Sequence, residues 1–493
     1  MTMTNTTSPA ARSIDFNSFL PEGESLFDYQ QVGVAYALVA RRTFIADEMG
    51  LGKTRQALVT LAVANAFPAV IVCPASLKGN WENEVKRCLP GKSVQVLYGN
   101  RPYETYADVV IINYDILADW ADVLDPQALV LDESHYVKNA GTAKKPVQRT
   151  AAAQALANRV PASGLVLLLT GTPIMNRPAE LVTQLRILNR LEEISPRPRK
   201  GNTDRDWEYA FKFTYCGPSQ NSYGKYEFKG ASNLTMLNER LRAACMIRRM
   251  RADVLNMNDT VRITVPMALN GKLDVYRAAE RDFLSFIAKE GGPEAAMKAS
   301  RALVITSMNK LRMMAGQAKI DAAVEWVNNF FEENEGRSLV VFAWHKEVQE
   351  ALVKAFPGCA QITQKTKGNV EAEKARFLSG EAKLIVVSIL MGQAGHTLVG
   401  PNIDCHDVVF FQQGWNPGTM QQAEDRINRI GQTAQYVFAH NTLAQGTIEE
   451  DIAAIIEEKR QVFNAAINGQ PMSEEDIEGS VQEAVLRRMA GRG

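Results

Sequence analysis

The string DEMGLGKT, which ends at Thr54, has the composition of a loop that binds phosphate. Gly50 and Gly52 allow backbone N–H groups to face an anion. Lys53 then supplies a cation for the β and γ oxygens of a nucleotide, and Thr54 supplies a hydroxyl for Mg²⁺. The string departs from the strict pattern, because Asp47 stands where the first glycine is expected. The same residues also suit the ordinary first turn of a helix, so the string alone leaves both interpretations open.

A second string, QQAEDRINRIGQ, carries two guanidinium groups far along the chain from the first. On a helix, Gln422, Arg426 and Arg429 lie at i, i+4 and i+7 and project from one face. Two guanidiniums and an amide on one face can bind phosphate oxygens bidentately. The alternative is a solvated helix in which Asp425 pairs with Arg429, a contact worth roughly a few tenths of a kcal/mol. The spacing favours phosphate binding.

Two more strings end predicted strands with polar residues. LVLDESH ends in Asp132 and Glu133, which beside a phosphate loop can hold Mg²⁺ and orient the attacking water, or can simply cap a turn. LLLTGTPI places Thr170, Gly171 and Thr172 after another apolar run, either as a loop that senses the γ-phosphate or as a common turn. Together with the phosphate loop the carboxylates favour catalysis, whereas spacing does not separate the two interpretations of the threonines.

Two aromatic strings lie close to these groups in sequence. LFDYQ contains Phe27 and Gln30, and an amide that both donates and accepts can read the edge of adenine, although a surface glutamine is the default. WNP contains Trp415, which either lies on a nucleic-acid backbone or packs the start of the following helix. These residues are therefore candidates for binding the base of ATP and a nucleic acid.

Apolar runs show which elements must position the candidates. From about residue 26 to 190, TFIAD, AVIVCP, DVVIINY, ALVLDE and GLVLLLTGT alternate with helical patterns. Continuous Val/Ile/Leu runs joined by helices predict parallel strands that are buried on both faces. A second series begins near residue 337 with SLVVFAW and continues with KLIVVSIL. The sequence therefore predicts two α/β lobes.

The length supports more than one domain, because 493 residues exceed the size at which one hydrophobic core keeps growing. We expect a flexible tail (1–22), a first ATP-binding lobe (23–190), helical and aromatic insertions that include the end of the first lobe (191–300), a second lobe (301–465) and a C-terminal tail with a short amphipathic helix (466–493).

The composition excludes several classes of protein. The 55 basic and 55 acidic residues cancel, so a nucleic-acid site must be a local groove. Six cysteines show no CxxC pair and no spacing suited to zinc. The polar N-terminus lacks a signal core, and no apolar run approaches the ~20 residues of a membrane helix. We expect a soluble intracellular protein with no membrane partner.

Taken in order, ten strings resemble the motifs of the Swi/Snf family of ATP-dependent DNA translocases, in helicase superfamily two. The resemblance covers roughly residues 26 to 460, and the IGQ ending favours the DNA-translocase branch. MIRRMRADVL followed by AGQAKIDAAVEWV resembles the annealing-helicase subgroup. The strings are LFDYQ, DEMGLGKT, IVCPASLKGNW, DVVIINYDIL, DESH, LTGTPI, MIRRMRADVL, LVVFAWHK, GQAGHTL and WNPGTMQQAEDRINRIGQT.

The resemblance implies two tandem RecA-like lobes with parallel sheets, helical insertions between them and ATP with Mg²⁺ in the cleft. It implies catalysis by Lys53, Asp132, Glu133 and two arginine fingers, Arg426 and Arg429. The implied ATP contacts are Phe27, Gln30, Met49, Gly50, Gly52, Lys53, Thr54, Gly395 and Gln422; the metal contacts are Thr54 and Asp132; the nucleic-acid contacts are Ser76, Asn113 and Trp415.

The implied function is ATP-dependent translocation on double-stranded or branched DNA, in repair, recombination or replication. The alternatives are a strand-separating DNA or RNA helicase and an ATP-gated DNA clamp. We expect sequence-neutral DNA binding by a monomer. Because the chain is little more than the motor, we also expect the cytoplasm of a bacterial or phage-infected cell.

Overall fold

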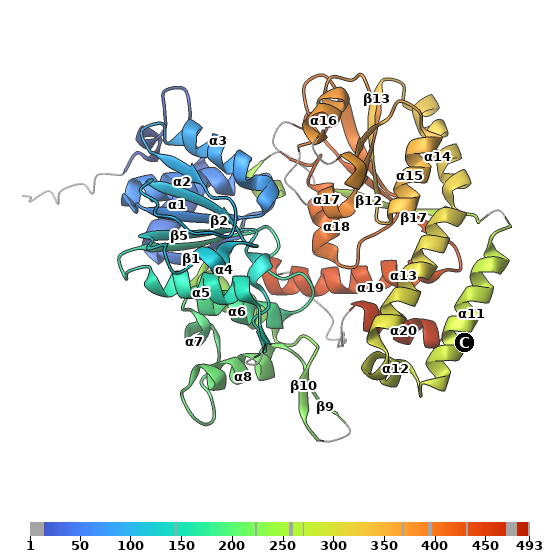
Figure 1. The fold of residues 1–493 in the computed structure, drawn as a ribbon, viewed down its shortest axis with the longest axis horizontal. Coiled ribbons are helices and arrows are strands. Elements are labelled where there is room, and N and C mark those ends of the chain that lie inside the picture. The colour runs from blue at the N-terminus through green and yellow to red at the C-terminus, as the bar shows by residue number, and fades with distance from the viewer. Residues whose placement is uncertain are drawn as a thin grey trace, which may run out of the picture.

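The computed structural model describes residues 14–142, 145–221, 224–255, 260–269, 271–366, 369–392, 397–429, 432–469 and 481–491. Two parallel sheets, each with helices on both faces, lie side by side, and helices join them on one side (Figure 1). This arrangement confirms the predicted α/β fold class with two lobes. Within the described residues, no helix is both long and apolar enough to cross a membrane.

The first sheet contains seven strands in the order β11-β1-β8-β5-β2-β4-β3, and every pair is parallel. Most of these strands are runs of Val, Ile and Leu, and their side chains alternate between two buried cores. The strands are β1 (Arg42–Ile45), β2 (Ala69–Cys73), β3 (Val94–Val96), β4 (Val109–Asn113), β5 (Ala128–Asp132), β8 (Leu165–Leu169) and β11 (Met246–Ile247).

Helices cover both faces of the first sheet, as crossover connections between parallel strands require. One core packs against α1 (Asp28–Ala40), α2 (Lys53–Ala64) and α3 (Lys78–Cys88). The opposite core packs against α4 (Leu117–Trp120), α5 (Gln148–Arg159) and α6 (Leu181–Ile187). The carboxyl ends of the strands therefore form the one edge at which loops from several strands can meet.

The second sheet is also parallel, in the order β12-β17-β16-β13-β15-β14. Helices α14 (Ile320–Glu333) and α15 (Lys346–Ala355) cover one face, whereas α16 (Val370–Leu378) and α18 (Pro417–Glu424) cover the other. The strands are β12 (Val261–Met267), β13 (Arg337–Ala343), β14 (Ala360–Ile362), β15 (Leu384–Ser388), β16 (Asp404–Phe410) and β17 (Phe438–Ala444).

Strand β12 corrects the predicted start of the second lobe at residue 301. It pairs with β17 over seven residues, although the sequence assigned its region to the insertions. As an edge strand it exposes most of its side chains and contains Pro266, so it lacks the continuous apolar run that marks a buried parallel strand.

The insertions project from both lobes. From the first lobe project α8 (Asp204–Tyr215), a hairpin of β9 (Pro218–Gln220) and β10 (Tyr226–Phe228), and α9 (Leu234–Ala244). Beside the second lobe, α11 (Leu273–Lys289), α12 (Pro293–Ala299) and α13 (Arg301–Ala318) share a core with α19 (Ile448–Phe463) and α20 (Val481–Ala490).

The C-terminal region corrects the prediction of a tail after residue 465. Helix α20 buries Val485, Leu486 and Met489 against α11, α12 and α19. Its apolar residues are spaced three and four apart and so form one helical stripe, which the neighbouring helices cover.

Helix α19 joins the two lobes (Figure 1). Its first turns pack in the helical core beside the second lobe through Ile448 and Ile452. Its last turn and the π-helical turn Asn464–Asn468 place Phe463 and Ile467 in the core of the first lobe. The side-chain amide of Asn238 donates to the Ile467 carbonyl over 2.8 Å and fixes this end.

Shortening Phe463 to alanine tests this attachment. Because the ring is 6% exposed within the first core, Phe463→Ala should lower the free energy of unfolding of the first lobe by about 3–5 kcal/mol in a urea titration. Tyr106, which is 86% exposed, provides the control, and Tyr106→Ala should change that free energy by less than ~0.5 kcal/mol. Equal, small effects for both variants would show that α19 does not dock on the first lobe.

Candidate functional site

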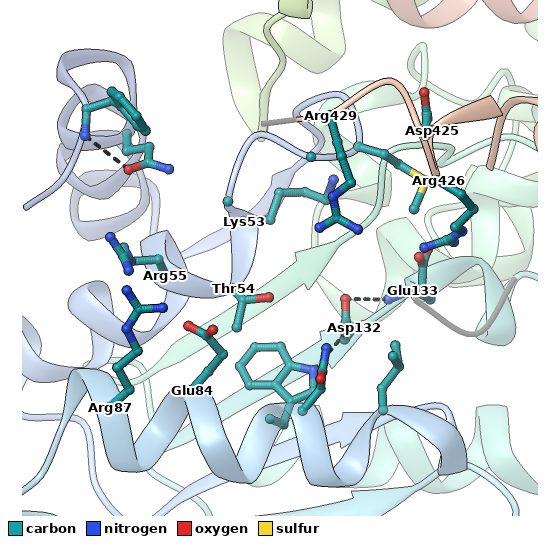
Figure 2. A pocket seen from close by; sticks show the side chains of 18 residues that line it. Lys53, Thr54, Arg55, Glu84, Arg87, Asp132, Glu133, Asp425, Arg426 and Arg429 are labelled. Carbon is teal, nitrogen blue, oxygen red and sulfur yellow. Dashed lines mark hydrogen bonds between the residues drawn. The ribbon is translucent and has the colours of Figure 1, made fainter. Parts of the chain in front are cut away.

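A cavity of about 430 Å³ lies between the carboxyl edge of the first sheet and the turn that follows α18 (Figure 2). It joins residues from both lobes, which the sequence places hundreds of positions apart. The described residues that line it are Phe27, Gln30, Met49, Gly50, Gly52, Lys53, Thr54, Arg55, Leu77, Asn80, Trp81, Glu84, Arg87, Asp132, Glu133, Asp425, Arg426 and Arg429.

The loop between β1 and α2 has the backbone of a phosphate cradle. Gly50 and Gly52 have φ values of 84° and 72°, in the left-handed region that favours glycine. A Cβ atom on Gly52 would lie 2.3 Å from the side-chain nitrogen of Gln30, so a larger residue does not fit. Since Gly52 caps α2, the free N–H groups of the first helical turn and the positive end of the helix dipole face the cavity.

The ammonium group of Lys53 lies within this loop. It donates to the backbone carbonyls of Asp47 and Glu48 over 2.8 and 3.2 Å. Burial lowers its pKa, against the opposing charges of Glu133, Asp47 and Asp132. Phosphate oxygens entering the cavity would offer stronger, charge-assisted acceptors than the two carbonyls.

Gln30 supports the loop with both ends of its amide. The oxygen accepts from the Phe27 backbone N–H over 3.0 Å, and the nitrogen donates to the Leu51 carbonyl over 3.1 Å. Phe27 lines the cavity, and its ring stacks on Tyr29 with centroids 5.7 Å apart while remaining 49% exposed. Phe27 therefore offers an apolar face to a base, whereas Gln30 fixes the position of the loop.

The two carboxylates at the end of β5 occupy different environments. The Asp132 side chain accepts from the Trp81 ring N–H over 2.8 Å and from the Glu133 backbone N–H over 3.0 Å. Burial and the charge of Glu133 raise the pKa of Asp132 to about 6. Glu133 adopts a φ of 50°, which turns its side chain away from that of Asp132.

The Glu133 carboxylate is held ionised. Burial alone would raise its pKa, but the His135 ring 3.4 Å away and the charges of Lys53 and Arg426 outweigh burial and lower it. A carboxylate that stays ionised inside a cavity is suited to orient and polarise a water molecule.

Arg426 and Arg429 line the cavity from the second lobe, but the predicted helix does not carry them. Helix α18 ends at Glu424, and the chain continues in tight turns in which the N–H groups of Arg426 and Ile427 donate to carbonyls three residues earlier. The two guanidiniums nevertheless point into the cavity (Figure 2). Burial and the neighbouring Arg429 lower the pKa of Arg426 to about 10, although the charge of Glu133 opposes this shift.

Gln422 corrects a predicted ATP contact. It remains on α18, is 1% exposed and donates its amide N–H to the Thr172 hydroxyl over 3.3 Å. It therefore joins the lobes instead of lining the cavity.

The Thr170–Thr172 loop contacts Arg248, Met49 of the phosphate loop and Gln422 of α18. The Thr172 backbone N–H donates to the Thr170 hydroxyl over 3.0 Å, and the Gly171 carbonyl accepts from Arg248 over 2.9 Å. A Cβ atom on Gly171 would lie 2.7 Å from the Met49 side chain, so glycine permits close packing against the phosphate loop. This placement suits a relay between the phosphate loop and α18.

Three arginines after β11, Arg248, Arg249 and Arg251, contact the phosphate loop and its neighbours, although their sequence pattern predicted no role for them. Strand β11 pairs with β1 in parallel register, so the residues that follow the two strands run alongside each other. Arg249 forms an ion pair with Asp47 and also donates to Gln56 over 2.8 Å. Three arginines in four positions, directly after a two-residue apolar strand, were the available signal in the sequence.

Of the predicted nucleic-acid contacts, two side chains are buried and one is exposed. Trp415 is 9% exposed, and its ring centroid lies 4.2 Å from the Arg312 guanidinium, so it packs in the helical core beside the second lobe and is not presented to a nucleic acid. Asn113 is buried with its oxygen accepting from Lys78 over 3.1 Å, which also contradicts the prediction. Ser76 is exposed in the turn after β2. Gly395 lies outside the described residues.

The donor set fits Mg²⁺ held jointly by protein and phosphate. Thr54 and Asp132 line the cavity with a hydroxyl and a carboxylate, both oxygen donors. Each Asp132 oxygen accepts one hydrogen bond and keeps further lone pairs. Across the described part of the chain, no three His, Cys, Asp or Glu side chains gather to hold a metal ion by themselves.

Comparisons with known proteins agree with this geometry. The SNF2-related domain matches residues 29–317, more than half of the chain. A Xenopus tropicalis protein, the SWI/SNF-related matrix-associated actin-dependent regulator of chromatin subfamily A-like protein 1, is 31% identical over 90% of this chain and 45% of its own. The mouse DNA annealing helicase and endonuclease ZRANB3 is 29% identical over 92% of this chain and 42% of its own. The chain thus spans about half the length of these relatives.

A solved structure is also similar. The Sulfolobus solfataricus SWI2/SNF2 ATPase core in complex with dsDNA is 21% identical over 90% of this chain and 93% of its own, with a TM-score of 0.41.

The relatives correct one prediction and confirm another. The expected location, the cytoplasm of a bacterial or phage-infected cell, is contradicted because relatives such as the Xenopus, cattle and mouse proteins come from animals, and one is by name a regulator of chromatin. That prediction rested on the small size of the chain, and a unit of this size also occurs inside proteins about twice as long. The family resemblance is confirmed: the chain belongs to the SNF2-related family.

Proposed function

We propose that the protein is a DNA-dependent ATPase that moves along double-stranded or branched DNA, in repair, recombination or replication. One observation carries the proposal: a single cavity joins Lys53 and Thr54, the carboxylates Asp132 and Glu133, and the guanidiniums of Arg426 and Arg429. These are the groups that phosphoryl transfer to water requires. Since both lobes of the site come from one chain, the protein works as a monomer.

The first lobe binds the nucleotide and prepares the attacking water. The backbone of the phosphate loop and the Lys53 ammonium hold the β- and γ-phosphates, and Phe27 packs against the base. Thr54 and Asp132 would hold Mg²⁺, which would supply positive charge to offset that of the phosphates. Glu133, held ionised, orients the water in line with the γ-phosphorus.

The second lobe completes the site. Arg426 and Arg429 reach the phosphates only when the lobes are closed. Arginine fingers stabilise the charge that develops during transfer and so raise the turnover rate by ~10³–10⁵-fold. Gln422 joins α18 to Thr172, next to the phosphate loop, so loss of the γ-phosphate can loosen the contact between the lobes. Alternate closing and opening moves the protein along DNA without requiring strand separation.

Family membership supports DNA as the partner. Two relatives carry DNA annealing or chromatin regulation in their names, and the near-zero net charge of this chain requires DNA to be bound in a local groove. Binding through phosphates should be sequence-neutral and weaken steeply with salt.

A panel of nucleic acids tests the partner. ATPase activity should rise most with duplex, forked or four-way-junction DNA at fixed salt, because the proposed partner is double-stranded or branched DNA. The measurement is steady-state phosphate release with duplex DNA, single-stranded DNA, branched DNA and RNA. Greater stimulation by RNA would indicate an RNA helicase, and ATP binding without turnover would indicate a DNA clamp.

Substitutions in each lobe test the two-lobe site. Lys53→Ala and Arg426→Ala should each reduce DNA-stimulated hydrolysis by about 10³-fold or more, because each removes a positive charge that stabilises the transferred phosphate. DNA affinity, measured by fluorescence anisotropy without nucleotide, should stay within about threefold of the unmodified protein, since neither side chain contacts DNA in this proposal. Normal turnover in Arg426→Ala would contradict the shared site.

The acid limb of the pH profile tests the Asp132 environment. Mg²⁺ needs the ionised carboxylate, so hydrolysis should fall as the pH drops through about 6, the raised pKa of Asp132. The Trp81 N–H stabilises the charged form, so Trp81→Phe should move this limb to higher pH. The measurement is kcat/KM for ATP from pH 5 to 8 at saturating duplex DNA; an unchanged limb would show that another group titrates.

A further inference from the structure

Arg251 connects groups from both sides of the nucleotide cavity. It begins α10 (Arg251–Val254), the short helix that follows β11. Because β11 continues alongside β1, with the Glu48 N–H donating to the Arg249 carbonyl over 3.0 Å, Arg251 arrives next to the phosphate loop. The register of two short strands thus fixes its position.

On the first lobe, Arg251 binds the phosphate loop at several points. Its backbone N–H donates to the Glu48 carboxylate over 2.7 Å, and its guanidinium lies 3.3 Å from the other oxygen of that carboxylate. The guanidinium also donates to the Met49 carbonyl over 2.9 Å. These contacts hold Arg251 and the loop as one unit.

On the second lobe, Arg251 meets the residue before the arginine finger. Its Nη1 lies 2.6 Å from the Asp425 carboxylate, and Asp425 is adjacent in the chain to Arg426. Arg251, Glu48 and Asp425 are 4%, 3% and 2% exposed. The guanidinium thus lies between two buried carboxylates, hydrogen-bonded to Glu48 and ion-paired with Asp425, a planar arrangement that the point charge of a lysine reproduces less well.

The two contacts respond differently to movement of the lobes. Glu48 and Arg251 both belong to the first lobe, so their ion pair persists when the cleft opens. Asp425 belongs to the second lobe and separates from Arg251 on opening. Two other contacts cross the cleft nearby, from Gln421 to Glu48 over 3.4 Å and from Gln422 to Thr172 over 3.3 Å, but both are hydrogen bonds from neutral amides.

We propose that Arg251 is a positioning residue that latches the closed cleft: it holds Asp425 against the phosphate loop and thereby sets Arg426 toward the γ-phosphate. This inference rests on the proposed ATPase function. Arg251 does not line the nucleotide cavity among the described residues, so it acts through Asp425 and not on the phosphates.

A double-mutant cycle with a direct measure of closure tests the latch. Arg251→Gln and Asp425→Asn should each lower kcat for DNA-stimulated hydrolysis by about tenfold or more while KM for ATP changes by less than about threefold. The double variant should be no slower than either single variant, because both remove the same contact. Arg251→Lys, which keeps the charge but not the fork, should give an intermediate rate.

Closure itself is measured by energy transfer between dyes on the two lobes. Suitable sites are Val39→Cys on α1, where Val39 is 86% exposed, and Glu371→Cys on α16, with Cys359→Ser to remove the one cysteine that is not buried. A non-hydrolysable ATP analogue with Mg²⁺ and duplex DNA should close the unmodified protein. Arg251→Gln and Asp425→Asn should each reduce the closed fraction.

Arg262 provides the matched control. It forms an ion pair with Glu424, also at the end of α18, but both residues lie in the second lobe, and the Nε and Nη2 distances are 3.0 and 2.6 Å. Arg262→Gln should leave the closed fraction unchanged. The latch would be overturned if the losses in kcat of the two single variants multiplied in the double variant. It would also be overturned if Arg251→Gln left the closed fraction unchanged. Absence of hydrolysis in the unmodified protein would instead overturn the proposed function, while the energy-transfer arm still tests the latch.

Discussion

The parallel pairing of β11 with β1 is the constraint on which the cleft depends. Only two residues of β11 pair, yet they fix Arg248, Arg249 and Arg251 alongside the phosphate loop. Each of these arginines pairs with a carbonyl or carboxylate at this edge of the sheet, including the Gly171 carbonyl and the Asp47 carboxylate. Buried polar groups are costly unless paired, so this short strand stabilises the loop on which nucleotide binding rests.

The sequence predicts the fold and the first half of the site well because their signals are local. Continuous apolar runs mark the inner strands of both sheets, and Gly50 and Gly52 mark a backbone conformation that few other residues adopt. Both signals are complete within a dozen residues. The outcome agrees with them, since the central strands are buried on both faces and both glycines have positive φ.

The features that the sequence did not predict depend on contacts between segments that are distant in the chain. Strand β12 is an exposed edge with little apolar signal, and the end of α18 at Glu424 follows from tight-turn hydrogen bonds that a helical period does not reveal. Trp415 shows the same limit, because its ring is buried by Arg312, which lies about a hundred positions earlier. Spacing places side chains on one element, whereas burial depends on which other element covers them.

The chain passes between the lobes three times, and the last passage brings α20 back beside the second lobe after α19 has entered the core of the first. It leaves the first sheet after β11 and enters the second at β12, and α19 later returns it to the core of the first lobe. The lobes are therefore held together at several separate points along the chain, which limits how far one lobe can shift relative to the other without breaking buried contacts.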